Sequence, residues 1–346
     1  TSSKFMNNNA TDGGALFSYE NNQFIESGNT YSGNIAVNGS DIYIMPYSII
    51  SLLNNVSQVI ISNNTLFNGT IPASYDLRDY NLVTSVKDQL NGGSCWAFAA
   101  CAALESCILK AVNVTYDLSE ENMKNLMALY SIHEYNKMLP NNGGIDVMPF
   151  GYFASWLGPV NETSDVYNDY STVSPILNNI LNIQNIYYIT RNSYTDNDAI
   201  KLAILNYGAV STNIYINIDD SYRNNNWGDY YYNGPLVYGN HEVTIVGWDD
   251  NYSASHFKVS PPANGAWIVK NSWGTDFGYE GYFYVSYYDT CFAPLGSSDS
   301  FTFILNDSTQ YNKNYQYDYV ARTDWFVTGK NSVWYSVEYN STGNDY

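Results

Sequence analysis

The pattern of apolar and polar positions changes along the chain, and its clearest segment is residues 94–111. This run, SCWAFAACAALESCILKA, is apolar on every side and dense in Ala. A helix that is hydrophobic all round is buried rather than amphipathic. We therefore expect a central, buried helix here.

Two further helices are predicted from their end signals. Residues 119–138 begin with Ser119 as N-cap, and Glu120 and Glu121 fall in the first turn, where the helix dipole favours negative charge. Residues 196–207 begin at an Asp-Asn pair and stop before a glycine. Both segments are therefore expected to lie in the helical part of the fold.

Beyond residue 210 the pattern favours strands. Four β-branched or aromatic runs follow one another, separated by Gly, Asn and Asp: STNIYINI, HEVTIVGW, GAWIVKNSW and GYFYVSYY. Helices first and strands after predict an α+β fold with a helical half and a β half. A functional cleft is expected between the two halves.

Composition divides the chain into three segments. Residues 1–70 are rich in Asn, Gly and Ser with short apolar bursts, which predicts short strands joined by turns. The runs FMNNNATDGG and VIISNNTLFNG indicate the end of a β-solenoid, with a prosegment as the alternative. Residues 71–295 carry the helices and strands of the main domain. Residues 296–346 are expected to begin a further β-rich, lectin-like module.

The charge balance narrows the choice of partners. Acidic residues outnumber basic ones, 33 to 14, and the formal net charge is −19. Such a surface repels phosphate backbones and anionic headgroups, so we expect no nucleic acid and no membrane partner. The longest apolar stretch, Ile42 to Leu53, falls short of the roughly 20 residues that a spanning helix needs. Charged residues make up only 14% of the chain, and its polar residues are mainly Asn, Ser, Thr and 35 Tyr. Such a composition is typical of secreted or cell-surface proteins.

Four cysteines constrain the redox environment. Cys101 and Cys107 lie six residues apart in one predicted helix, roughly 9 Å along its axis and on different faces, so they cannot bond each other. At most one disulfide joins one of these, or Cys95, to Cys291. An extracellular protein with mostly free thiols suggests an anaerobic or reducing habitat.

Cys95 is the candidate nucleophile. The segment Gly92-Gly93-Ser94 makes a tight approach to the predicted helix, and Cys95 lies in its first turn. There the helix dipole and a nearby imidazolium are expected to depress the thiol pKa to roughly 3.5 to 7.5. The alternative is a buried structural cysteine, as Cys101 is expected to be.

The candidate base is one of three histidines. His133 falls inside a predicted helix and His256 in a polar loop, whereas His241 opens a strand. Asn271 lies at the exit of the next strand, and an antiparallel pairing would make it a neighbour of His241. An Asn carbonyl there would accept the Nδ1 proton of the imidazole and fix its orientation. The alternative is that both are incidental polar residues at strand ends.

These residues belong to a series of motifs that resembles a known family. The runs are IPASYDLRDYNLVTSVKDQLNGGSCWAFAACAALES, LSEENM, PNNGGIDV, GNHEVTIVGW and KNSWGTDFGYEGYFYV. In order and spacing they resemble the papain-like cysteine proteases, from about Ile71 to Cys291. His241 follows Cys95 by 146 residues, within the roughly 130 to 150 typical of the family. Asn271 follows Cys95 by 176 residues, because the polar insertion DDNYSASHFKVSPPANG lengthens the loop between two strands.

The resemblance implies a two-lobed papain-like fold and a set of catalytic roles. Cys95 would be the nucleophile, His241 the base and then the acid, and Asn271 the residue that orients His241. The side-chain amide of Gln89 would join the backbone N–H of Cys95 in the oxyanion hole. Trp273 would shield the Asn and His pair from water.

The resemblance also implies how substrate binds. Gly143, Gly144 and the adjacent Ile145 would lie along an extended substrate peptide, because only glycine lets the substrate backbone come so close. Glu242 would border the pocket for the second residue before the cleaved bond, where the family usually has a small residue. A carboxylate there would favour Lys or Arg. The alternative is that Glu242 turns to solvent or pairs with a lysine.

Some features depart from the family pattern. Gly92 and Asn141 stand where the family usually has two bonded cysteines, so that bridge is expected to be absent. Phe277 stands where the family has a tryptophan. Residues 1–70 show no helical inhibitory prosegment, and they resemble large repeat-rich surface proteins of anaerobic archaea.

The sequence therefore predicts a cysteine endopeptidase, secreted or at a cell surface, whose partners are peptide or protein substrates. Two alternatives are an adhesin or glycan-binding protein matured by its own protease domain, and a peptide-joining transferase with the same triad. The flanking β-rich regions are candidates for contact with cell wall or glycan. No cofactor or metal is expected, although the clusters Asp219-Asp220 and Asp249-Asp250-Asn251 could supply calcium ligands in place of being solvated turns.

Overall fold

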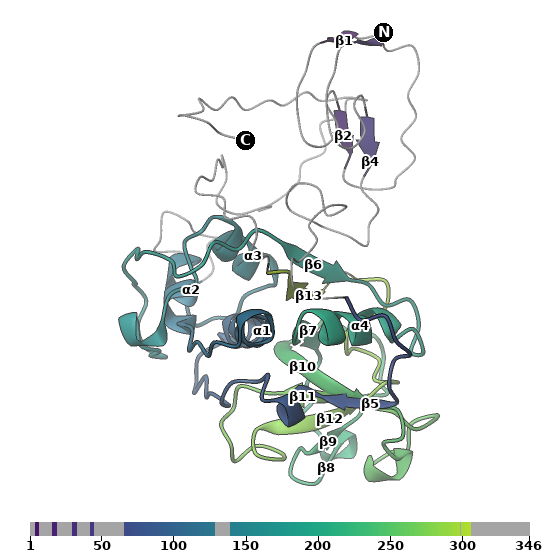
Figure 1. Cartoon of the computed structure of the whole chain (residues 1–346). Helices are drawn as coiled ribbons and strands as arrows, with labels where there is room; N and C mark the ends of the chain where they lie inside the picture. The colour runs from purple at the N-terminus through teal and green to yellow at the C-terminus, as the bar shows by residue number, and fades with distance from the viewer. Residues whose placement is uncertain are drawn as a thin grey trace.

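The computed structural model describes residues 66–128, 139–297 and 299–305, together with four short strands nearer the N-terminus (Figure 1). The α-helices of this part of the chain are α1 (Cys95–Val112), α2 (Glu120–Leu126), α3 (Val147–Ala154) and α4 (Asp198–Asn206). Short 3₁₀ helices are η1 (Leu77–Tyr80), η2 (Glu162–Ser164), η3 (Asp220–Tyr222) and η4 (Ala254–His256).

A nine-stranded sheet forms the centre of the fold. Its order is β6 (Ile186–Ile189), β13 (Ser300–Phe303), β7 (Val210–Ile214), β10 (His241–Asp249), β11 (Ala266–Lys270), β12 (Tyr282–Ser286), β9 (Asp229–Tyr230) and β8 (Arg223–Asn224). The remaining strand, β5 (Ser74–Asp76), pairs with the far end of β10. β12 and β9 pair in parallel, and the other neighbours are antiparallel.

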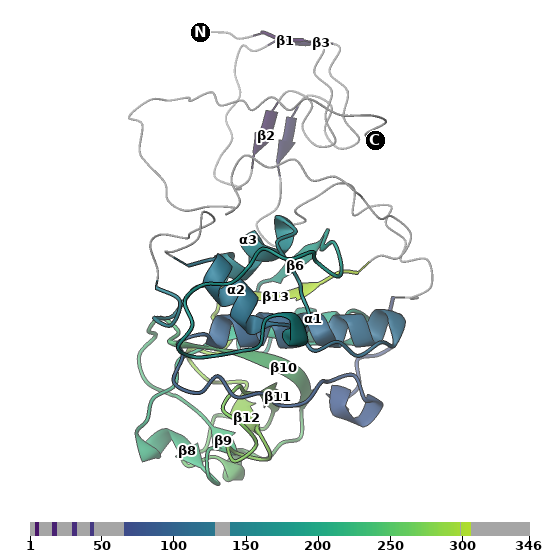
Figure 2. The same cartoon turned by 90° about the vertical axis from the view of Figure 1, so that its left-hand side faces the viewer.

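Helix α1 runs through the middle of the molecule, as its sequence predicts. Figure 2 shows α2 and α3 on one side of it and the strands β10 to β12 on the other. Its residues from Trp96 to Leu109 are buried except for Ala102. By length and composition it is the one helix among the described residues that could cross a membrane, yet it is mostly buried inside the fold. The predicted α+β class, with a helical half and a β half, is confirmed.

The start of α2 and the end of α4 follow the predicted signals. The side chain of Ser119 accepts a hydrogen bond from the backbone N–H of Asn122 at 3.0 Å, which caps α2. That helix ends at Leu126, earlier than predicted, and residues 129–138, which include His133, lie outside the described part of the chain. Helix α4 ends before Gly208, whose φ of +127° suits glycine.

Helix α3 is not predicted by the sequence pattern, because its run VMPFGYFA contains a proline and a glycine. Pro149 falls in the first turn, where its missing N–H costs no helical hydrogen bond. The side chain of Asp146 caps the helix by accepting from the N–H of Val147 at 3.1 Å. Asp146 lies two residues after Gly144, so α3 begins beside the expected substrate strand.

Strand β13 changes the expected arrangement of the C-terminal segment. Its residues fall within 296–346, which the sequence assigns to a further module, but the strand inserts between β6 and β7 of the main sheet. Phe301 and Phe303 are buried in the core around α1. The main domain therefore extends to this strand, and residues 306–346 lie outside the described part of the chain.

The four N-terminal strands form two parallel pairs. β1 (Lys4–Met6) pairs with β3 (Thr30–Ser32), and β2 (Leu16–Ser18) pairs with β4 (Ile42–Ile44). In both pairs the facing residues are 26 positions apart in the sequence. Equal spacing of parallel strands is a property of solenoid rungs. The solenoid and the other domain assignments outside the main sheet stay predictions.

Candidate active site

His241 and Asn271 are joined by a hydrogen bond at the ends of neighbouring strands. β10 and β11 are antiparallel, with Thr244 opposite Lys270. This register brings His241 Nε2 to 2.8 Å from Asn271 Oδ1, and both residues are buried. The expected cross-strand neighbourhood of the two side chains is therefore present.

The neighbouring Ser272 fixes which ring nitrogen of His241 carries the proton. Its backbone N–H donates to Asn271 Oδ1 at 2.9 Å, so that atom must be the amide oxygen. His241 Nε2 then donates to the same oxygen, and Nδ1 is left unprotonated. The prediction that Nδ1 faces Asn271 is wrong. In this register Asn271 lies closer to the middle of the paired strands than His241 does. The ring therefore contacts it through Nε2, the nitrogen farther from the backbone.

Trp273 covers this pair. Its ring lies 4.6 Å from that of His241, centre to centre, at an angle of 32°. Phe277 in turn packs edge-on against Trp273 at 5.0 Å, in the place where the family has a tryptophan. Burial lowers the pKa of His241 to about 4, opposed by its hydrogen bond with Asn271. The imidazole is therefore neutral at physiological pH.

Cys95 is the first residue of α1, and the two glycines before it lie in the segment that leads into the helix. Burial raises the pKa of its thiol to about 12, and the charge of Glu242 adds to this. Hydrogen bonds with the backbone of Glu242 and Trp96 act in the opposite direction. The depressed pKa expected from the helix dipole is therefore not present. Burial thus acts against the charged form of both the thiol and the imidazole.

Gln89 is held at both ends of its amide. Its Nε2 donates to the carbonyl of Gly92 at 2.8 Å, and its Oε1 accepts from the hydroxyl of Ser272 at 2.6 Å. Its backbone N–H also donates to the carbonyl of Ser272 at 2.8 Å. Ser272 thus contacts both Gln89 and Asn271. The sequence analysis gave Ser272 no role. Its position between Asn271 and Trp273, two residues of the expected site, could have marked it as a candidate.

The paired glycines are needed for different reasons. Gly143 has a φ of +93°, and a Cβ built on it would meet no atom within 4 Å, so its face is open. A Cβ on Gly144 would lie 2.2 Å from Nε1 of the Trp96 indole. The space in front of Gly143 is therefore free, and Gly144 is needed for the packing against α1. Ile145, which follows, is 43% exposed.

Tyr167 supports the segment before Cys95, where the family usually has a disulfide. Its hydroxyl donates to the carbonyl of Gln89 at 2.8 Å and lies 2.7 Å from the hydroxyl of Ser94. A Cβ on Gly92 would meet the Tyr167 hydroxyl at 2.5 Å, so the phenol occupies that space. The N–H of Gly93 donates to the carbonyl of Asn141 at 3.0 Å. All four cysteines of the chain are free.

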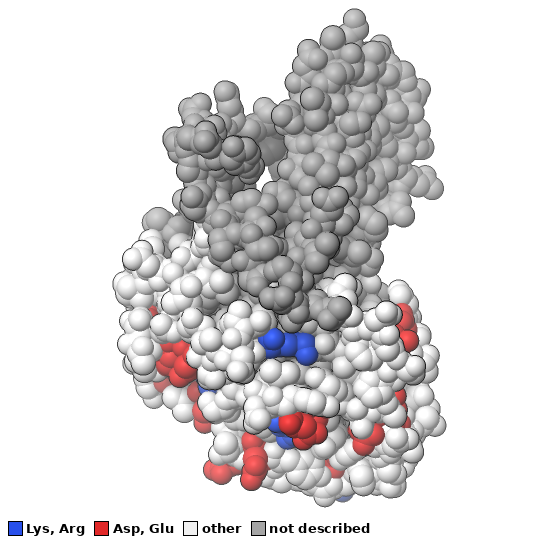
Figure 3. Space-filling view, viewed as in Figure 1, with Lys and Arg blue, Asp and Glu red and all other residues white. Residues whose placement is uncertain are grey.

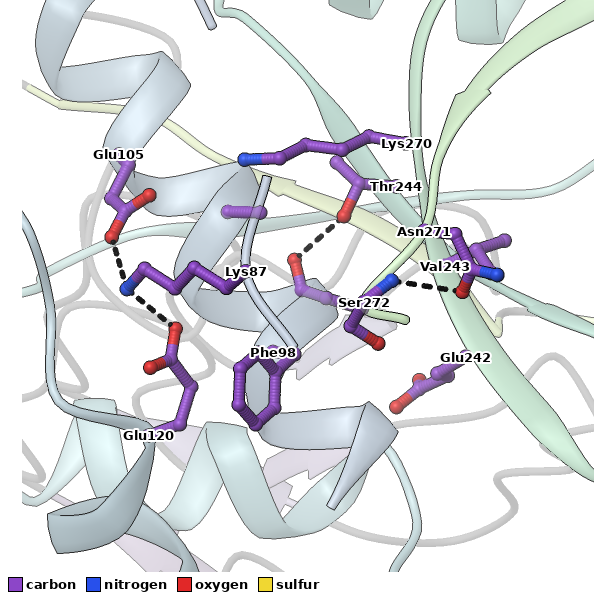
Figure 4. Close-up of a pocket in the computed structure, with 12 residues that line it drawn as sticks. Lys87, Phe98, Glu105, Glu120, Glu242, Val243, Thr244, Lys270, Asn271 and Ser272 are labelled. Atoms are coloured by element: carbon purple, nitrogen blue, oxygen red, sulfur yellow. Dashed lines mark hydrogen bonds and ion pairs between the residues drawn. The ribbon is translucent and has the colours of Figure 1, made fainter. Parts of the chain in front are cut away.

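A pocket lined partly by charged side chains lies beside the site, between α1 and the strands β10 and β11 (Figure 4). Lys87 bridges Glu105 at 3.1 Å and Glu120 at 2.8 Å. Lys270 donates to the hydroxyl of Thr84, which donates to Glu105. This network ties α1 and α2 to β11, whose last residue is Lys270, next to Asn271, so it fixes the two halves of the fold against each other.

Neither acidic cluster forms a metal site in the structure. The carboxylate of Asp250 accepts from Lys201 and from the hydroxyl of Tyr287, and that of Asp219 caps η3. No group of three His, Cys, Asp or Glu side chains among the described residues is placed to hold a metal ion.

Comparison with known proteins decides the family. The model for the papain family of cysteine proteases matches residues 71–294. The chain belongs to the papain family of cysteine proteases. This membership agrees with the motifs and confirms both the papain-like fold and the expected enzyme class.

Several papain-family relatives share about three tenths of their aligned residues with the chain. Fruit bromelain of Ananas comosus is 28% identical over 253 residues, which are 69% of this chain and 62% of the relative. A cathepsin L-like protein of Caenorhabditis elegans is 30% identical over 216 residues, 62% of this chain and 59% of the relative. The chain thus spans about three fifths of the length of these relatives.

Solved structures of cysteine proteases superpose on the chain. The clostridial cysteine protease Cwp84, after propeptide cleavage, has a TM-score of 0.62 at 29% identity. The aligned part covers 71% of this chain and 61% of the Cwp84 chain. A second structure holds the cysteine protease and lectin-like domains of Cwp84, described as a surface layer associated protein of Clostridium difficile. Its TM-score is 0.61 at 29% identity, and the aligned part covers 70% of this chain and 53% of the second structure.

Proposed function

We propose that this chain hydrolyses peptide bonds with Cys95 as the nucleophile, His241 as the base and Asn271 as the residue that orients the base. The observation that carries this is the shared acceptor Asn271 Oδ1, which holds the His241 proton on Nε2 and leaves Nδ1 free to accept another. Cys95 lies beside Glu242, the residue that follows His241. Membership of the papain family supports the same assignment.

Burial favours the neutral thiol and the neutral imidazole as the starting forms of the reaction. As the sulfur of Cys95 attacks the carbonyl carbon, its proton passes to His241 Nδ1, and the imidazolium gives that proton to the departing amine. The product of this step is a thioester on Cys95. Water then attacks the thioester with His241 again as the base, which restores the thiol and releases the acid.

The oxyanion that forms in each attack needs donors on one side of the cleft. As the first residue of α1, Cys95 has a backbone N–H with no partner inside the helix. Gln89 Nε2 donates one of its two protons to Gly92 and keeps the second for the oxyanion. Because both groups are fixed in advance, they stabilise the charge without reorganisation.

A labelling experiment tests this function. The full chain should be covalently modified by a thiol-reactive epoxide with a peptide-like arm, and the modification should stop hydrolysis of an unfolded peptide library. The Cys95→Ala variant should resist labelling, whereas Cys101→Ala, which removes a buried cysteine of the same helix, should not. The proposal is contradicted if the Cys95→Ala variant is still labelled, or if it still hydrolyses the peptides. Products formed with and without an added amine separate a hydrolase from a peptide-joining transferase.

We propose further that the protein acts outside the cell or on its surface. The support is the surplus of acidic residues, seen as scattered red patches with few Lys or Arg on the face in Figure 3, and the two parallel strand pairs near the N-terminus. The Cwp84 structure pairs a protease with a lectin-like domain in a surface layer associated protein. Contact of the flanking regions with glycan or cell wall, an adhesin role, and an archaeal source stay hypotheses.

Labelling of intact cells tests the location. A membrane-impermeant amine reagent should modify the chain on cells of its natural source, or the chain should be recovered from the medium. If it is modified only after lysis, the proposal of a surface or secreted enzyme fails.

A further inference from the structure

The turn between β8 and β9 has a left-handed backbone. Its residues Asn225, Asn226 and Trp227 have φ values of 48°, 52° and 70°, so three consecutive residues lie in the left-handed region. Asn adopts this conformation more readily than most residues, but for a bulky residue such as Trp it is an outlier. Contacts elsewhere in the fold must therefore hold Trp227 in place.

The turn is joined to the segment that follows Trp273. The carbonyl of Asn226 accepts from the backbone N–H of Gly278 at 3.0 Å. The side-chain amide of Asn226 donates to the carbonyl of Asp276 at 3.1 Å. The residue that precedes Trp227 therefore connects the turn to this segment through both its backbone and its side chain.

Trp227 packs on the aromatic residues that cover the proposed catalytic pair. Its ring lies edge-on to that of Trp273, at 6.4 Å between the ring centres and an angle of 86°, an arrangement that aromatic pairs favour. It also lies 6.1 Å from the ring of Phe277, which itself packs edge-on against Trp273. Trp273 thus has two aromatic neighbours from different segments, and its own ring lies 4.6 Å from that of His241.

Other residues of the chain hold Trp227 from its own hairpin. The guanidinium of Arg223 lies over the Trp227 ring, 4.0 Å from its centre, and pairs with Asp220 at 2.5 Å. Contact between a guanidinium and an indole face is attractive. Tyr230 of β9 stacks on the same indole at 6.2 Å. The indole is therefore half-buried, and the face under Arg223 is not open to a ligand.

We propose that Trp227 is a positioning residue, which holds Trp273 over the hydrogen bond between His241 and Asn271 and so helps to keep water from that bond. This inference rests on the proposed peptidase function and adds a residue to it. Trp227 acts through Trp273 and does not touch the reacting atoms. A hydrogen bond shielded from water is electrostatically stronger than an exposed one, so the shield helps Asn271 to orient the ring.

The shield also acts on the protonation of His241. Burial is the main influence on the pKa of this ring, which it lowers to about 4. At this end of the sheet the titratable groups on the surrounding elements are Cys95 of α1, Lys270 of β11 and Glu242, the next residue on the same strand. Ile214, opposite on β7, carries no charge. If the shield opens, water stabilises the charged ring and the pKa rises.

The first test measures the ring directly and needs no hydrolysis. In the Cys95→Ala background, NMR titration of the three histidines should show that Trp227→Ala raises the pKa of His241 by about one pH unit. Trp227→Phe, which keeps an aromatic ring, should leave it nearly unchanged. Trp156→Ala is the matched control and should have no effect. Trp156 is also half-buried with a positive φ, of 60°, but its indole donates to the carbonyl of Ile183.

The second test follows hydrolysis. Trp227→Ala should lower kcat roughly 2- to 10-fold with KM unchanged, the fold-change that corresponds to one aromatic pair. The acid limb of kcat/KM should move to higher pH, because a protonated His241 cannot accept the thiol proton. In a chain that already carries Trp273→Ala, the same substitution should have almost no further effect, since Trp227 acts through Trp273.

A milder variant keeps the test decisive if Trp227→Ala does not fold. In Asn226→Gly the residue can keep its left-handed backbone, because glycine adopts it readily, but the side-chain bond to Asp276 is lost. The His241 pKa and the acid limb should then shift in the same direction, by less. No shift in this folded variant counts against the proposal.

The outcomes separate this inference from the proposed function. An unchanged His241 pKa in Trp227→Ala, or losses that simply add in the variant lacking both tryptophans, overturns the inference, while hydrolysis by the wild-type chain leaves the peptidase function standing. A raised KM with an unchanged kcat also overturns it, because Trp227 would then contact substrate. If the wild-type chain hydrolyses no peptide and Cys95 resists the epoxide, the proposed function fails, and the titration still decides whether Trp227 shields His241.

Discussion

His241→Ala is expected to lose peptide hydrolysis as completely as Cys95→Ala, on the order of 10⁴- to 10⁶-fold in kcat. His241 Nδ1 is the proposed acceptor of the thiol proton, and a thiol that keeps its proton attacks a carbonyl only slowly. Because the two residues act as one unit, the double variant should be no slower than either single one. Asn271→Ala should cost less, since Asn271 orients the ring and transfers no proton.

Single-turnover rates on one peptide substrate measure this effect, and near-ultraviolet circular dichroism checks that each variant is folded. The acid limb of kcat/KM should fall near pH 4, because burial lowers the pKa of His241 to about that value and the protonated ring cannot accept a proton. Near-normal rates in His241→Ala would show that another group is the base. Strictly additive losses in the double variant would also contradict the paired role.

Gln89→Ala is expected to lower kcat on the order of 10²- to 10³-fold, the usual effect of losing one oxyanion donor. The Gln89 amide is fixed by Gly92 and Ser272 before substrate arrives, so its second proton can stabilise charge that develops only in the reaction. The ground-state carbonyl gains little from it. Substrate binding should therefore barely change.

Stopped-flow measurement of acylation, with KM determined separately, distinguishes the two effects. Ser272→Ala is the matched control, because it removes one hydrogen bond to the Gln89 amide and leaves the donor in place. Its loss should be smaller than that of Gln89→Ala. A raised KM with an unchanged kcat in Gln89→Ala would mean that the amide contacts bound substrate rather than the oxyanion.

The sequence predicts most of the elements that hold the site, because their signals are local. The buried helix α1 follows from a run without a polar face, and the strands that carry His241 and Asn271 follow from β-branched residues between turns. Helix α3 escapes prediction because Pro149 and Gly151 are read as breakers. Strand β13 escapes because its place in the sheet depends on partners more than 80 residues earlier in the sequence.

The electrostatics of the site could not be predicted in the same way. The helix dipole at Cys95 is visible in the sequence, but the burial that outweighs it is not. The choice of Nε2 rather than Nδ1 depends on how far along the sheet Asn271 lies from His241. Tyr167 lies 72 positions after Cys95 with no motif around it, so only the folded chain reveals its contact with Ser94 and Gln89.

The phenol of Tyr167 has a consequence for where such an enzyme can work. A thiol nucleophile needs a reductant to protect it from oxidation, and the same reductant opens disulfides by thiol exchange. Where a disulfide braces the loop before the nucleophile, these two requirements conflict. Here that loop is braced by Tyr167 and by backbone hydrogen bonds, which thiols do not attack. Concentrated reductant can keep the Cys95 thiol reduced without loosening its support, and the loop can reach its final shape with no oxidant present.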